Sequence, residues 1–122
     1  MADKNYADIM HDAAIAIQGF LRGMAFSRVR EIANTCSIFK IGKTGETIEE
    51  RKNQSDYRDK YEHIKEVYSS TDPHLVDNVE AELIREFIFH PKCDNIKDGF
   101  TSKSDPMREG ASKYCVYVVW NN

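Results

Sequence analysis

The segment from 113 to 120, Lys-Tyr-Cys-Val-Tyr-Val-Val-Trp, constrains the fold more than any other part of the chain. Almost every position is apolar, and β-branched and aromatic residues predominate, which is typical of a strand. A strand with apolar side chains on both faces needs cover on both faces. We therefore expect a central strand near the C-terminal end, with neighbouring strands that come from earlier in the chain.

Two other segments are predicted to supply those neighbours. Residues 36–42, Cys-Ser-Ile-Phe-Lys-Ile-Gly, combine β-branched and aromatic residues and stop at a glycine. Residues 61–69 alternate more weakly between apolar and polar side chains, so we expect an edge strand there. Together with residues 113–120 they predict a small three-stranded, mostly antiparallel sheet.

Helices are expected to flank this sheet, which makes the fold class α+β. A mostly polar helix is predicted over 47–60, since Thr47 and Glu50 have the spacing of a capping box. A second helix is predicted over 74–89, between a turn signal and a proline. Residues 92–112 are rich in Lys, Asp, Gly and Ser and predict a long loop.

A third helix is predicted over residues 5–33, with a break near Gly23 as an alternative. Its apolar residues recur in steps of four and three and form one narrow stripe. The stripe consists of Tyr6, Met10, Ala13, Ile17, Phe20 and Met24. We expect this stripe to pack on the core of the chain's own domain. The alternative is a seam between two copies in a homodimer.

The length of 122 residues fits one domain, 1–122, with a helical extension over 1–33 and a core over 36–120. The three cysteines are odd in number and widely spaced, so we expect a reducing compartment without disulfides. No targeting segment or membrane span is visible. These features favour a cytoplasmic protein, or an intracellular protein of a virus or phage. The net charge of -3 means that any contact with DNA requires a local basic patch.

One carboxylate falls on the apolar face of the helix predicted over 74–89. The face is formed by Val76, Val79, Leu83, Ile84 and Phe87, and Glu80 lies within it at 100° per residue. A buried, unpaired carboxylate costs on the order of several kcal/mol. Glu80 therefore needs a metal, a hydrogen-bond network or a cation such as Arg51 or Lys40, unless it reaches water at the rim.

Several segments resemble the GIY-YIG nuclease family. Residues 39–44, Phe-Lys-Ile-Gly-Lys-Thr, are similar to the second half-motif of the family in a K-I-G variant, and Arg51 follows on the next helix. Residues 79–84, Val-Glu-Ala-Glu-Leu-Ile, resemble the family's helix with a metal-binding glutamate, which selects Glu80. Asn95 resembles the asparagine that closes the site.

The first half-motif of the family is absent from its usual place before the second. Cys115-Val116-Tyr117 near the C-terminus resembles it, with Cys in place of Gly. A circular permutation that cuts the hairpin and moves its first strand to the end explains this order. The expected succession is then strand, helix, strand, helix, long loop, strand.

The resemblance implies a metal-dependent DNA endonuclease that hydrolyses phosphodiester bonds. It assigns catalytic roles to Tyr117, Arg51, Glu80 and Lys40. Glu80 is expected to hold a single Mg²⁺ or Mn²⁺, and Arg51 to clamp the phosphate. Tyr117 is expected to activate or position the water, provided that nearby cations lower its pKa. Lys40 replaces the second tyrosine of the family.

Three further residues are expected to bind the DNA substrate: Lys43, Lys52 and Asn95. The alternative function is a catalytically inactive module that keeps the fold and binds nucleic acid or protein. The lysine at position 40, the lost glycine at position 115 and the acidic net charge favour this alternative. A salt bridge between Glu80 and Lys40 that blocks the site would support it as well.

Overall fold

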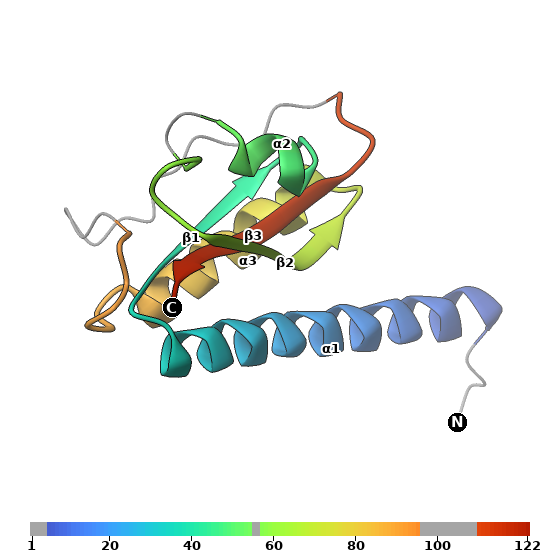
Figure 1. Cartoon of the computed structure of the whole chain (residues 1–122). Helices are drawn as coiled ribbons and strands as arrows, with labels where there is room; N and C mark the ends of the chain where they lie inside the picture. The colour runs from blue at the N-terminus through green and yellow to red at the C-terminus, as the bar shows by residue number, and fades with distance from the viewer. Residues whose placement is uncertain (1–4, 55–56, 96–109) are drawn as a thin grey trace.

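The computed structural model describes residues 5–54, 57–95 and 110–122 (Figure 1). The elements in chain order are α1 (Tyr6–Thr35), β1 (Ile38–Thr44), α2 (Ile48–Lys52), β2 (His63–Ser70), α3 (Pro73–Phe87) and β3 (Tyr114–Asn121). This succession confirms the α+β class. Most of the predicted loop, residues 96–109, lies outside the described residues.

The sheet has the strand order β1-β3-β2, and both pairings are antiparallel. The last strand of the chain is therefore the central one, as its apolar pattern predicted. Every residue of β3 from Tyr114 to Val119 is buried. The expected edge strand is β2, and β1 forms the opposite edge.

Each face of the sheet is covered by its own apolar cluster. The larger cluster joins one face to α3 and to the C-terminal third of α1, and it includes Phe39, Ile41 and Leu83. The smaller cluster lies on the other face, where Tyr57 and Tyr117 pack with Ile48 of α2 among others. The two covered faces explain why β3 carries no alternation of polar and apolar residues.

Helix α2 is shorter than the helix that was predicted over 47–60. It ends at Lys52 instead of residue 60, although Thr47 accepts the expected cap hydrogen bond from the Glu50 amide at 3.2 Å. The next residues, Asn-Gln-Ser-Asp, favour turns because their side chains compete for backbone hydrogen bonds. Of the described residues that follow, Tyr57 to Lys60 form turns, which bring the Tyr57 ring into the smaller cluster.

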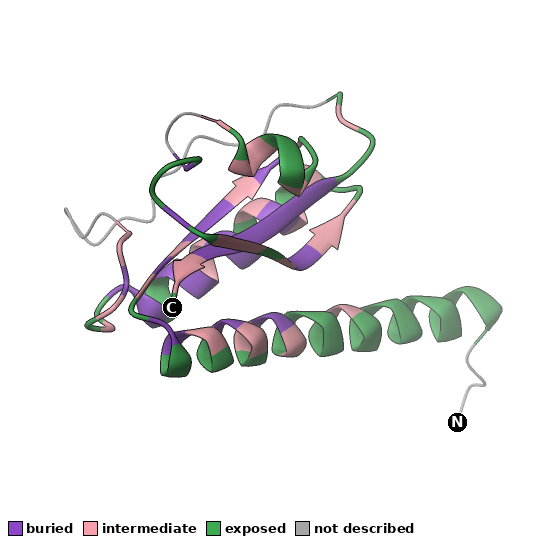
Figure 2. Ribbon diagram, in the orientation of Figure 1, coloured by how far each residue is buried: buried purple, intermediate pink, exposed green. Residues whose placement is uncertain are grey.

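Helix α1 is continuous through Gly23. The first two-thirds of this helix are mostly exposed (Figure 2). The expectation that its apolar stripe packs on the domain's own core was wrong. The buried residues are Ala25, Val29 and Ala33, and they lie about 140° around the helix from the centre of the stripe. Phe20 in the stripe is 66% exposed. Among the described helices, none has the length and apolar character that crossing a membrane requires.

Shortening a side chain in the larger cluster should destabilise the whole domain. Leu83 has no exposed surface, so Leu83→Ala leaves a cavity and should lower the free energy of unfolding by about 2 to 5 kcal/mol. Phe89→Ala is the control, since Phe89 is 64% exposed and should cost less than about 1 kcal/mol. Urea denaturation followed by circular dichroism measures both. Equal costs would contradict this assignment of the core.

Candidate active site

A tyrosine and a glycine meet across the strands β1 and β3. Tyr117 is the cross-strand partner of Gly42, and the tyrosine ring lies directly against the glycine. A Cβ atom at Gly42 would overlap the Tyr117 hydroxyl oxygen and lie closer to it than real Cβ contacts allow. The side chain of Tyr117 therefore has its place only because residue 42 has none.

Arg51 on α2 reaches the same hydroxyl. Its Nε donates a hydrogen bond to the Tyr117 hydroxyl oxygen at 3.0 Å, although 66 positions separate the two residues. Its guanidinium also donates to the Gln54 side chain. Arg51 is half-buried, so the fold holds its guanidinium plane by several contacts while part of the side chain remains accessible. The structure thus brings together two of the four expected catalytic residues.

Tyr57 completes this group, and the sequence analysis missed it as a site residue. The Tyr117 hydroxyl donates to the Tyr57 hydroxyl at 2.9 Å. The Arg51 guanidinium carbon lies 4.0 Å from the centre of the Tyr57 ring, and the Lys40 ammonium lies 5.6 Å from it. Both cations gain from the negative face of the ring. The sequence identifies Tyr57 only as an apolar residue in the mostly polar segment 47–60, which does not distinguish a site residue from a core residue.

The environment of Tyr117 does not favour a phenolate. Burial raises the pKa of its hydroxyl far above the usual range, and the neighbouring Tyr57 adds to the shift. Arg51 acts in the opposite direction without reversing it. The condition that cations lower the pKa of Tyr117 is therefore not met in this structure. The neutral hydroxyl accepts the hydrogen bond from Arg51 Nε.

Glu80 is buried as its place on the apolar face predicted, with 3% of its surface exposed. Its cationic partner is Lys43, not Arg51 or Lys40. The Lys43 ammonium lies 3.6 Å from Glu80 Oε1 and 2.7 Å from Asp77 Oδ1. Asp77 and Glu80 are separated by nearly one turn of α3, so both carboxylates reach one lysine.

The two groups of residues lie on opposite faces of the sheet. Gly42 pairs with Tyr117, which belongs to the smaller cluster, and Lys43 pairs with Val116, which belongs to the larger one. Successive residues of a strand point to opposite faces. Glu80 therefore approaches β1 from the α3 side, whereas Tyr117 and Arg51 approach it from the α2 side. Both groups contact β1, at Gly42 on one face and at Lys43 on the other.

Asn95 attaches to the outer edge of β1. Its side-chain oxygen accepts a hydrogen bond from the Ile41 amide, and its side-chain nitrogen donates to the Ile41 carbonyl, both at 2.9 Å. The backbone just before it adds two hydrogen bonds to Phe39. The asparagine amide thus pairs with the strand as another backbone would, and it holds β1 in place between the two groups.

A hollow of mixed charge lies beside the tyrosines on the α2 side. Lys52 shares a shallow hollow with Arg58 and Lys60, next to the acidic residues Asp59 and Glu62. The Lys60 ammonium lies 5.5 Å from the ring of Tyr61, which belongs to the smaller cluster. The structure therefore places Lys52 in a neighbouring hollow, apart from the residues that touch Tyr117.

The donor set on the α3 side is compatible with one divalent ion. Among the described residues no cluster of three or more His, Cys, Asp or Glu side chains exists. Asp77 and Glu80 nevertheless direct carboxylate oxygens toward a position that a positive charge already occupies. Mg²⁺ typically binds one or two carboxylates and completes its shell with water and phosphate. The residues thus fit a site that depends on the substrate for part of its ligands.

Comparisons with protein-family models, with curated proteins and with solved structures found no match.

The contact between Gly42 and Tyr117 predicts that substitution by alanine changes stability in opposite directions at two glycines. Gly42→Ala should lower the free energy of unfolding by about 1 to 3 kcal/mol, because the new methyl group overlaps the buried Tyr117 ring. Gly19→Ala makes the same change in α1, where no atom lies within 4 Å, and should raise stability by up to about 1 kcal/mol. Thermal denaturation measures both. A neutral Gly42→Ala would mean that Tyr117 moves freely from the glycine.

Proposed function

We propose that the chain is a metal-dependent DNA endonuclease of the GIY-YIG kind in which the first strand follows the rest of the domain. The observation that carries this proposal is the meeting of Tyr117, Gly42 and Arg51. The resemblance selected these residues from three separate segments. They converge through the pairing of β1 with β3 and a hydrogen bond from α2.

The strand order supports the permutation. β1 and β3 are neighbours and antiparallel, as the two arms of a hairpin would be if its turn were cut. The cut would separate the end of β3 from the start of β1, which α1 now precedes, and the segment between α3 and β3 would supply the new connection. The sheet needs no rearrangement to accept the changed chain order.

The residues on the two faces of β1 have different proposed roles. Arg51 binds a phosphate with a guanidinium that Tyr117, Gln54 and Tyr57 hold in one orientation. Lys43, released from one of its carboxylates, neutralises phosphate charge from the α3 side. A divalent ion held by Glu80 would stabilise charge on the leaving oxygen as a Lewis acid.

A second candidate function is an inactive binding module, and the pairing of Lys43 favours it. The lysine ammonium lies within 4 Å of both Asp77 and Glu80, so the chain's own cation already satisfies these carboxylates. The protonated state of Tyr117 also suits a protein that binds phosphodiesters without cutting them. Lys52, in the neighbouring hollow, would serve either function.

The endonuclease proposal predicts metal-dependent nicking of supercoiled plasmid at low salt. The wild-type chain should nick with Mg²⁺ or Mn²⁺ and not with chelator. Glu80→Gln should abolish nicking, because it removes the charge that binds the ion while preserving shape. Arg51→Ala should slow nicking ~100-fold or more, as loss of an oriented donor to developing charge does. Glu86→Gln is the matched control, since Glu86 is on the exposed side of α3.

Circular dichroism first establishes that each variant is folded. Nicking that persists in Glu80→Gln would come from a contaminant or from another site, and it would refute the role of Glu80. If the folded wild-type chain does not nick but shifts the fluorescence anisotropy of labelled DNA, the binding module is the correct function.

A further inference from the structure

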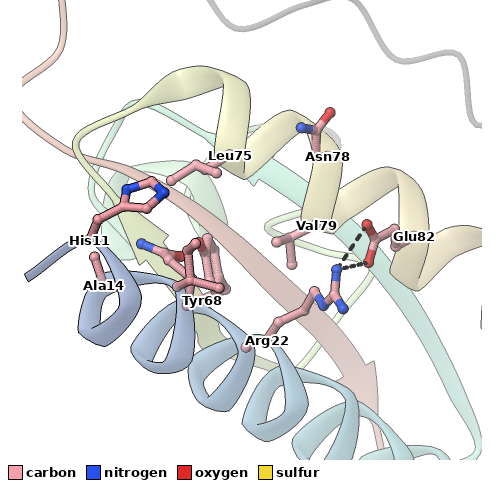
Figure 3. A pocket seen from close by; sticks show the side chains of 11 residues that line it. His11, Ala14, Arg22, Tyr68, Leu75, Asn78, Val79 and Glu82 are labelled. Atoms are coloured by element: carbon pink, nitrogen blue, oxygen red, sulfur yellow. Dashed lines mark hydrogen bonds and ion pairs between the residues drawn. The ribbon is translucent and has the colours of Figure 1, made fainter. Parts of the chain in front are cut away.

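Two polar contacts fix the rotation of the exposed part of α1 about its own axis. The Tyr68 hydroxyl donates to the Gln18 side chain at 2.6 Å, and Arg22 forms an ion pair with Glu82 at 3.3 Å. Between them α1 and α3 border an apolar groove of about 430 Å³, which residues such as Leu75 and Val79 line (Figure 3). The helix therefore cannot roll about its axis to bury its apolar stripe on the domain without losing both contacts.

The stripe from Tyr6 to Met24 consequently faces away from the domain. Its members include Tyr6 and Ile17, which are 77% and 57% exposed. An aromatic side chain alone carries ~150–250 Å² of surface, so the stripe and its flanks offer on the order of 500 Å² or more. That area approaches the ~800 Å² that each partner contributes to a typical specific interface.

The spacing of the stripe is self-complementary. Its members are symmetric about position 15, so an antiparallel copy places Tyr6 opposite Met24, Met10 opposite Phe20 and Ala13 opposite Ile17. Each layer then combines a large side chain with a smaller or more flexible one, as even packing requires. A parallel copy would stack Tyr6 on Tyr6 and Ala13 on Ala13, which gives overfilled and underfilled layers.

The extent of the stripe agrees with the same arrangement. In the antiparallel register Asn5, the N-cap of the helix, lies opposite Ala25, where α1 begins to be buried against its own domain. The paired length therefore matches the part of α1 that has no buried residue, and the contacts of Gln18 and Arg22 with the domain lie on another side of the helix from the stripe. Residues 6–24 hold only three charged side chains, Asp8, Asp12 and Arg22, and none is in the stripe. That composition suits neither an anionic membrane nor DNA, both of which require clustered Lys and Arg.

We propose that the stripe on α1 pairs with the same stripe of a second copy, as an antiparallel two-helix seam with a two-fold axis near Ile15. The interface is isologous, since one surface serves both copies. The dimer does not depend on the proposed endonuclease function. A monomer that nicks DNA would contradict only the dimer, and a dimer that does not nick DNA would contradict only the endonuclease.

Sedimentation of the full chain across a concentration series tests the seam. The wild type should be a dimer, and Ile17→Asp should raise the dissociation constant at least ~100-fold, because it buries two carboxylates at the centre. Ile15→Asp is the matched control: Ile15 is 59% exposed on the side toward the groove, and this variant should remain dimeric. A monomeric wild type, or equal effects of the two substitutions, would overturn the proposal.

Disulfide cross-linking tests the antiparallel register. Met10→Cys mixed with Phe20→Cys should form a mixed disulfide dimer under mild oxidation, and neither variant should cross-link alone. The native cysteines Cys36, Cys93 and Cys115 are buried and should give little background. Cross-linking of each variant with itself, and none between the two, would show parallel helices and overturn the register.

Discussion

The close contact between the Tyr117 ring and Gly42 is the constraint on which the candidate site depends. The ring occupies the volume that a side chain at residue 42 would need, so a larger residue there would displace Tyr117. The hydroxyl of the ring then becomes the point where Arg51 and Tyr57 converge. Because Tyr117 comes from the central strand, the two clusters that cover the sheet also fix its position. The stability of the fold and the orientation of Arg51 are therefore coupled.

The charged residues on the α3 side of the sheet contribute less to the stability of the fold. Lys43, Asp77 and Glu80 are charges inside a largely apolar layer, and such groups contribute little net stability once desolvation is counted. Removal of Lys43 should cost stability, because Glu80 is 3% exposed and loses a nearby cation. Asp77 and Glu80 both face this lysine, so the arrangement on α3 depends on all three side chains.

The sequence predicted those features of the fold that follow from local pattern. The apolar run of β3 indicated a central strand, and the position of Glu80 in the apolar face of α3 indicated a buried carboxylate. Features that depend on tertiary contacts were not predictable in this way. The partner of Glu80 was expected among Arg51 and Lys40, but strand alternation directs Lys43 toward α3 and Lys40 toward Tyr57. The early end of α2 and the place of Tyr57 result from turn residues whose effect only the packed structure reveals.

The first helix shows why periodicity identifies an apolar stripe but not what covers it. A stripe in steps of four and three fits a domain core and a helix pair equally well, because both bury one face of a helix. Here the helix is oriented by contacts outside the stripe: Ala25 and Val29 pack on the sheet, and Gln18 and Arg22 reach β2 and α3. These contacts use the face that the stripe leaves free. One helix thus presents two faces with separate partners, and only the face toward the domain is satisfied within a single copy of the chain.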